Sequence, residues 1–113
     1  MIVRLPSFVL APIIGGAWSI TLGIVILIKR AQYVQDEEHW LLPHELLHQE
    51  RQLAMGVLRW WWRYATDKQF RLAEEVLAYR LSMDKGLDLF RASRFLQAYG
   101  VELTDAQAVG LLT

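Results

Sequence analysis

The sequence predicts an α+β fold, in which a small antiparallel sheet is followed by three to four helices. Two observations lead to this prediction. The N-terminal third alternates apolar with small residues, and the remainder places apolar residues at helical spacing between typical cap residues. The chain of 113 residues is 54% apolar, which is enough for one core, so we expect a single domain over residues 1–113. Strands are expected in 1–30, two long helices in 40–83 and further helices in 87–113.

Charge and cysteine content exclude several classes of function. Lys and Arg together number 12, as do Asp and Glu, so the chain lacks the basic excess of a nucleic-acid-binding protein. There is no cysteine, so neither a disulfide scaffold nor a thiolate zinc site can form. Any zinc ion must be held by histidine and carboxylate groups, which is the kind of ligand set found in catalytic sites.

The N-terminal third favours strands. Gly15 and Gly16 form a two-residue hairpin signal between apolar runs. The following segment is rich in β-branched residues and alternates, with Ser19, Thr21 and Gly23 on the face opposite to the large apolar side chains. Pro12 would place the first strand at an edge or break it. The large apolar residues on the other face are Trp18, Ile20, Leu22, Ile24, Ile26 and Ile28.

The same third is also compatible with a membrane span. No charged residue occurs from Phe8 to Ile28, and Lys29 and Arg30 follow as a cytoplasmic flank would. We expect a cytoplasmic protein, with a membrane-anchored chain as the alternative.

The feature around which the rest of the chain is placed is an HExxH motif, His44-Glu45-Leu46-Leu47-His48. On a helix, residues four apart lie on one face, so His44 and His48 can present their rings to one metal ion. Glu45 is next to His44 in the sequence, so its carboxylate can lie close to the same ion and accept a proton from water, as the general base of a metallohydrolase does. The motif therefore predicts a Zn²⁺ site with Glu45 as the catalytic residue.

The motif helix is expected from about Leu41 past Gln52. The polar segment from Gln32 to Trp40 reads as a loop, and Pro43 suits a first helical turn. Gly56 is expected to end or bend the helix before three consecutive tryptophans, at least one of which should be exposed.

A second helix is expected from Lys68 to about Met83, capped by Thr66-Asp67. It carries two candidates for a third ligand, Glu74 and Glu75. Helical geometry places Glu74 among apolar residues and Glu75 on a more polar face, which leaves the choice open.

This second helix resembles that of the gluzincins, in which the motif helix gives two histidine ligands and a following helix gives a glutamate. The residues that carry the likeness are the motif itself and Glu75-Val76-Leu77-Ala78-Tyr79. The chain is most similar to the minigluzincins and related short proteins of phage and prophage genomes, over roughly Trp18 to Arg80. The resemblance implies a minimal zincin-like metallopeptidase fold, with Glu75 as the third zinc ligand beside His44 and His48.

Two positions depart from the gluzincin pattern. Tyr79 stands where the family has an aspartate that supports a histidine ligand, and a phenol orients imidazole less strongly than a carboxylate. The family's tyrosine or histidine that stabilises the transition state has no assured counterpart; Tyr33, Tyr64 and Tyr79 are candidates.

The C-terminal part predicts an amphipathic helix over Leu87–Tyr99, ended by Gly100, and a short helix capped by Thr104-Asp105. We expect both to cover the core on the side away from the cleft.

Together these observations predict a zinc metallopeptidase that acts on a peptide or protein substrate. An exposed strand near Ile13 to Thr21 is expected to pair with the extended substrate. Zinc binding should weaken below about pH 6, where free imidazoles become protonated. The alternatives are a catalytically silent zinc-binding or partner-binding domain, and a membrane-anchored protein in which the motif is incidental.

Overall fold

The computed structural model describes residues 1–14 and 17–113. Over these residues the chain forms three strands and seven helices, so the predicted α+β class is confirmed. The strands are β1 (Ile2–Leu5), β2 (Ser19–Leu22) and β3 (Val25–Lys29). The helices are α1 (Ser7–Ile14), α2 (Gln32–Gln35), α3 (Glu38–Met55), α4 (Val57–Thr66), α5 (Lys68–Asp84), α6 (Leu89–Gln97) and α7 (Asp105–Leu112).

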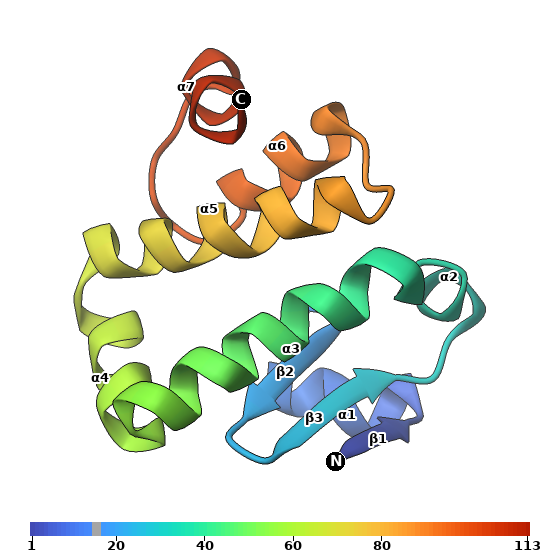
Figure 1. Ribbon diagram of the computed structural model, residues 1–113. Coiled ribbons are helices and arrows are strands. Elements are labelled where there is room, and N and C mark those ends of the chain that lie inside the picture. The colour runs from blue at the N-terminus through green and yellow to red at the C-terminus, as the bar shows by residue number, and fades with distance from the viewer. Residues whose placement is uncertain (15–16) are drawn as a thin grey trace.

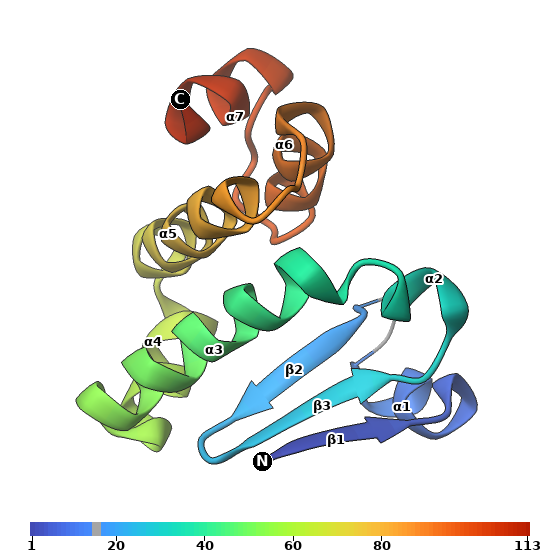
Figure 2. The same ribbon diagram turned by 45° about the vertical axis from the view of Figure 1, so that its right-hand side comes forward.

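The elements stack in layers, as Figure 1 shows. Helix α3 lies across the sheet, α5 packs on α3, and α6 and α7 lie beyond α5 (Figure 2). Helix α4 joins the far ends of α3 and α5. The two long helices are therefore held side by side next to the sheet, which is the arrangement that the candidate site needs.

The sheet is mixed, so the prediction of an antiparallel sheet was wrong for one strand. The strand order is β1-β3-β2, with β2 antiparallel to β3 and β1 parallel to it, Ile2 opposite Ile26. Parallel pairing requires a long connection between the two strands, and α1 and β2 supply it.

Residues 7–14 form helix α1 and not the predicted first strand. The run from Phe8 to Ile14 is apolar throughout and has no period-2 pattern, so periodicity alone cannot distinguish a strand from a helix there. The carbonyl oxygen of Pro6 accepts the first helical hydrogen bonds, from the N–H groups of Val9 and Leu10. The predicted hairpin at Gly15-Gly16 lies outside the described residues.

The alternating segment from Trp18 to Ile28 is two strands with a turn between them at Gly23, whose φ of 61° favours glycine. Thr21 lies opposite Ile26, so both point to the same face of the sheet, and both are buried. On β2 the small polar residues therefore face α3, whereas Leu22 and Ile24 are exposed. The six large apolar residues predicted to share one face are therefore divided by the turn, since Ile26 lies on the same face as Thr21.

Two glutamines of α3 hold the tip of this hairpin. Gln52 accepts a hydrogen bond from the Gly23 N–H at 2.7 Å and donates one to the Thr21 carbonyl at 3.0 Å. Gln49 donates to the carbonyl of Gly23 at 3.0 Å. Strand β2 is thus fixed to α3 by buried side-chain bonds as well as by packing.

The motif helix starts earlier than predicted. The expected loop from Gln32 to Trp40 contains α2 and the first turn of α3, because buried Val34 and Trp40 anchor this segment in the core. Pro43 consequently lies inside α3 and not in its first turn. Gly56 ends α3 with φ 103°, as expected.

The second long helix, α5, follows the prediction closely. The Asp67 side chain caps it by accepting hydrogen bonds from the N–H groups of Gln69 and Phe70. The three tryptophans lie on α4, which follows α3 and precedes α5 in the chain. Together with α1 and α2, this helix raises the number of helices in the described residues to seven, above the predicted three to four. Trp60 is buried and Trp62 is exposed, as expected for three consecutive helical positions. Among the residues that the structure describes, no helix combines the length and apolar character needed to cross a membrane.

Candidate metal centre and cleft

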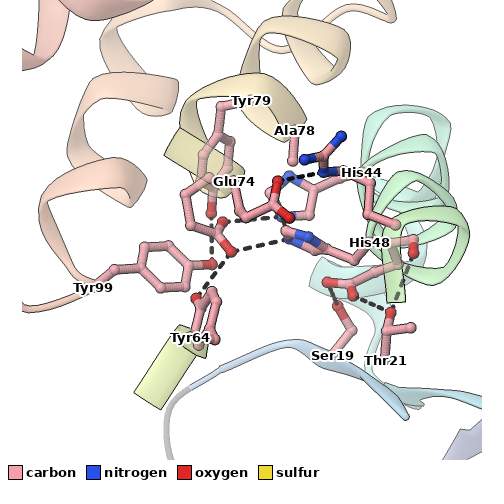
Figure 3. A network of polar contacts seen from close by, with 12 residues as sticks. Ser19, Thr21, His44, His48, Tyr64, Glu74, Ala78, Tyr79 and Tyr99 are labelled. Atoms are coloured by element: carbon pink, nitrogen blue, oxygen red, sulfur yellow. Dashed lines mark hydrogen bonds and ion pairs between the residues drawn. The ribbon is translucent and has the colours of Figure 1, made fainter. Parts of the chain in front are cut away.

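Three buried side chains from α3 and α5 converge between these helices. His44 and His48 lie one turn apart on α3, and Glu75 comes from the middle of α5. The Nε2 atoms of the two histidines are 3.1 Å apart. Glu75 approaches with Oε1 at 2.9 Å from Nε2 of His48 and Oε2 at 3.3 Å from Nε2 of His44 (Figure 3).

This donor set fits a zinc ion. Each residue offers one ligand atom, and the three atoms lie within 4.8 Å of one another. Two imidazoles and a carboxylate form the ligand set of a catalytic zinc site. Oε2 of Glu75 is buried and accepts no hydrogen bond from any residue that the structure describes. A buried carboxylate oxygen without a partner is costly, and a cation among these three side chains would remove that cost.

A serine supports the first histidine. Nδ1 of His44 lies 3.3 Å from Oγ of Ser82. The Ser82 hydroxyl donates its single proton to the carbonyl oxygen of Ala78 or Trp40, at 3.1 and 3.3 Å, since these oxygens can only accept. Ser82 therefore accepts a hydrogen bond from Nδ1–H of His44, which leaves the lone pair of Nε2 directed at the other ligands. Sequence reasoning missed Ser82, which lies two helical turns after Glu75.

The charge on the second histidine is set by Glu75. Burial opposes the charged imidazole, but the Glu75 carboxylate outweighs it and raises the pKa of His48 to about 9. Burial would in turn raise the pKa of Glu75, but the charged His48 beside it holds that pKa well below its usual range. Without a metal ion, His48 and Glu75 are therefore a buried ion pair at neutral pH.

The two candidate glutamates face different neighbours. Glu74 accepts hydrogen bonds from Arg51 and, at 2.7 Å, from the indole N–H of Trp60, away from the histidine rings. The structure thus brings Glu75, and not Glu74, to His44 and His48. Assignment of the ligands themselves stays a prediction.

Glu45 points from α3 towards strand β2. Its Oε1 accepts a hydrogen bond from Ser19 at 2.8 Å, and its Oε2 accepts one from Thr21 at 2.6 Å (Figure 3). Both hydroxyls come from the polar face of the alternating segment, and that face was the sequence signal that could have identified them. Two charge-neutral donors keep this buried carboxylate in one orientation at the cleft.

The candidate tyrosines separate into different roles. Tyr64 donates a hydrogen bond to Oε1 of Glu75 at 2.9 Å. Tyr79 packs its ring against His44, with ring centroids 4.4 Å apart, and its hydroxyl pairs with that of Tyr99 at 2.9 Å. Tyr33 is 54% exposed and packs on Trp18, outside the described lining of the cleft. Tyr99 was missed, because no sequence pattern connects it with a motif some fifty residues earlier.

A cleft with two lobes opens beside the three converging side chains. The larger lobe, about 550 Å³, reaches His44, and the smaller lobe, about 220 Å³, reaches His48 and Glu75. Glu45 and Tyr99 line both. Because Phe95, Ala98 and Tyr99 belong to this wall, the expectation that the C-terminal helices lie away from the cleft was wrong for the helix predicted over Leu87–Tyr99.

The edge strand beside the cleft is shorter than predicted. The predicted segment from Ile13 to Thr21 begins within α1, and its described part reaches the sheet edge only from Ser19, where β2 starts. On that edge, the carbonyl oxygen of Thr21 is already bonded to Gln52, so backbone pairing with a substrate is restricted to the Ser19 end.

Comparison of the chain with protein-family models, with curated proteins and with solved structures gives no match.

Proposed function

We propose that the protein is a zinc-dependent hydrolase that cleaves peptide bonds. The observation that carries the proposal is the convergence of His44, His48 and Glu75, with a fourth side chain, Glu45, held at the cleft by two hydroxyls. His44, His48 and Glu75 would hold the ion. Zinc, when bound, supplies a Lewis acid that polarises a carbonyl group and lowers the pKa of water.

Glu45 is the general base in this proposal. Its two carboxylate oxygens are bonded to Ser19 and Thr21, so Glu45 is not needed as a ligand and keeps a fixed direction. It accepts the proton of the attacking water and can pass it to the leaving amine.

The other polar side chains position the ligands. Ser82 holds the tautomer of His44 that exposes Nε2, and Tyr64 orients Glu75 through its hydrogen bond to Oε1. The Trp18, Trp40 and Tyr79 rings give the cleft an apolar wall beside His44, and a low-dielectric wall strengthens electrostatic interactions there.

The test compares zinc content with cleavage of a mixed peptide library for three proteins: the wild type, His48→Ala and Glu45→Gln. The proposal expects zinc and cleavage in the wild type, neither in His48→Ala, and zinc without cleavage in Glu45→Gln. Zinc in the wild type without any cleavage would favour the catalytically silent zinc-binding domain, and a wild type that binds no zinc would eliminate both functions.

A further inference from the structure

The two lobes of the cleft meet beside the proposed metal ligands. Ser19, Glu45 and Tyr99 belong to the lining of both lobes, whereas His44 faces the larger one and His48 the smaller one. A chain that fills both lobes must therefore pass the two histidines and Glu45. What it places in each lobe depends on the chemistry of the two walls.

The larger lobe is an aromatic pocket. The ring of Trp18 lies 5.8 Å from that of Trp40 and 5.3 Å from that of Phe95, and Tyr79 adds a further ring to the lining. Its lining contains no lysine, arginine or aspartate, and Glu45 is its one carboxylate among the described residues. About 550 Å³ is within the usual range of small-ligand pockets, and such walls favour a large apolar group.

The smaller lobe holds a hydrogen-bond donor without an acceptor. Nε1 of Trp61 is buried and has no partner among the described residues. A buried indole N–H normally finds an acceptor. The neighbouring polar groups are engaged elsewhere, since Tyr64 donates to Glu75 and the Gln52 amide bonds Gly23 and Thr21. Because Nε1 has almost no accessible surface, the Trp61 ring must turn before a backbone carbonyl of a bound peptide can accept a hydrogen bond from it.

We propose that the cleft binds an extended peptide with a large apolar, preferably aromatic, side chain in the larger lobe and a backbone carbonyl on the indole N–H of Trp61 in the smaller lobe. This substrate class rests on the proposed function for its connection with hydrolysis. The binding itself depends only on the two walls, so it can be tested with and without zinc.

The test follows the indole N–H resonances of the ¹⁵N-labelled full-length protein during titration with two capped dipeptides, N-acetyl-phenylalanyl-alanine amide and N-acetyl-seryl-alanine amide. The five tryptophan signals are assigned by single substitution. The phenylalanyl peptide should shift the Trp61 signal downfield and bind roughly 10- to 100-fold more tightly than the seryl peptide, since it buries a large apolar side chain.

Two variants test the two lobes separately. Trp61→Phe keeps an aromatic ring and removes the donor, so affinity should fall about 2- to 10-fold, whereas Trp62→Phe, on the exposed neighbour, should change nothing. Ala98→Trp, on the wall of the larger lobe, should abolish the preference for phenylalanine, whereas Ala65→Trp, on an exposed position of α4, should retain it. If Trp61→Phe fails to fold, the shift of the Trp61 resonance in the wild type still tests whether the indole N–H binds the peptide.

Each outcome separates this inference from the proposed function. Binding of the phenylalanyl peptide with the expected shift but without cleavage supports the inference and contradicts the hydrolase. Cleavage of library peptides with no preference for apolar side chains, and with Trp61→Phe equal to Trp62→Phe, overturns the inference and leaves the hydrolase standing. No binding of either dipeptide, with or without zinc, also overturns the inference.

Discussion

Nδ1 of His44 and Oγ of Ser82 lie 3.3 Å apart across the packed faces of α3 and α5. This contact connects a proposed metal ligand to the helix that carries Glu75, so the orientation of the His44 ring depends on how the two helices pack. Such supporting contacts typically change metal affinity or activity by about 10- to 100-fold when they are removed.

Ser82→Ala should therefore weaken zinc binding by about 10- to 100-fold while the protein stays folded. Competition with a chromophoric zinc chelator measures the affinity. Ser93→Ala is the matched control, because Ser93 is also buried in a helix and donates to a carbonyl three residues earlier, far from the histidines in sequence. Equal affinity in the two variants would show that Ser82 does not support the site.

Zinc should bind at one ion per chain, and His48→Ala should lose it, because two ligand atoms do not hold a catalytic ion firmly. Metal analysis after dialysis measures the content. His39→Ala is the control, since His39 is exposed on the same helix. Retention of a full equivalent of zinc by His48→Ala would contradict the ligand assignment.

The two adjacent glutamates should respond in opposite ways. Glu75→Gln should lose zinc, whereas Glu74→Gln should keep it and lower the free energy of unfolding by about 1–3 kcal/mol, because Arg51 and Trp60 lose a charged acceptor. Metal content and urea unfolding measure the two effects. If Glu74→Gln loses zinc and Glu75→Gln keeps it, the third ligand is Glu74 and not Glu75.

Glu45→Gln should keep zinc and lower hydrolysis by about 10²- to 10⁴-fold, since the amide keeps the size of the side chain and removes its basicity. The control is Glu50→Gln on an exposed position of the same helix. A Glu45→Gln protein with full activity would mean that another group accepts the proton.

Zinc binding at neutral pH should release about one proton. The pKa of His48 is raised to about 9 by Glu75 in the absence of metal, and a ligand must be a neutral imidazole. Affinity should therefore increase with pH up to about 9 and not level off near 6, as ordinary imidazoles would predict. Calorimetric titration at pH 7 in buffers of different ionisation enthalpy counts the protons; a heat that is independent of the buffer would contradict the raised pKa.

The stability of the zinc-free protein should change with pH in the opposite direction to the zinc affinity. The folded-state pKa of His48 lies above the ordinary histidine value of about 6.5, so the stabilisation from the charged pair is complete below about pH 6.5 and is lost as the pH rises through about 9. Urea unfolding at pH 6.5 and pH 9.5 measures this loss, and His48→Gln should largely abolish the difference.

Local patterns predicted the two long helices well. The Asp67 cap, Gly56 and the motif are signals within one turn of the elements that they define, so they can be read without the fold. Helix α1 could not be predicted, because its apolar run has no period. The parallel strand β1 could not be predicted either, because its partner in the sheet lies 24 residues away.

The same distinction applies to the site. Spacing within a helix brought His44 and His48 together, and the resemblance selected Glu75. The hydrogen bonds of Glu45 to Ser19 and of His44 to Ser82 join residues 26 and 38 positions apart, and only tertiary packing creates such pairs.

The bonds from Gln49 and Gln52 to the tip of the hairpin have a consequence for motion. They make β2 and α3 one rigid unit, so Glu45 and its two hydroxyl partners cannot separate when the cleft widens. A widening of the cleft between α3 and α5 would then bend the chain at Gly56 and Asp67, on either side of α4. An ion with ligands on both helices would connect α3 to α5 and would oppose this widening.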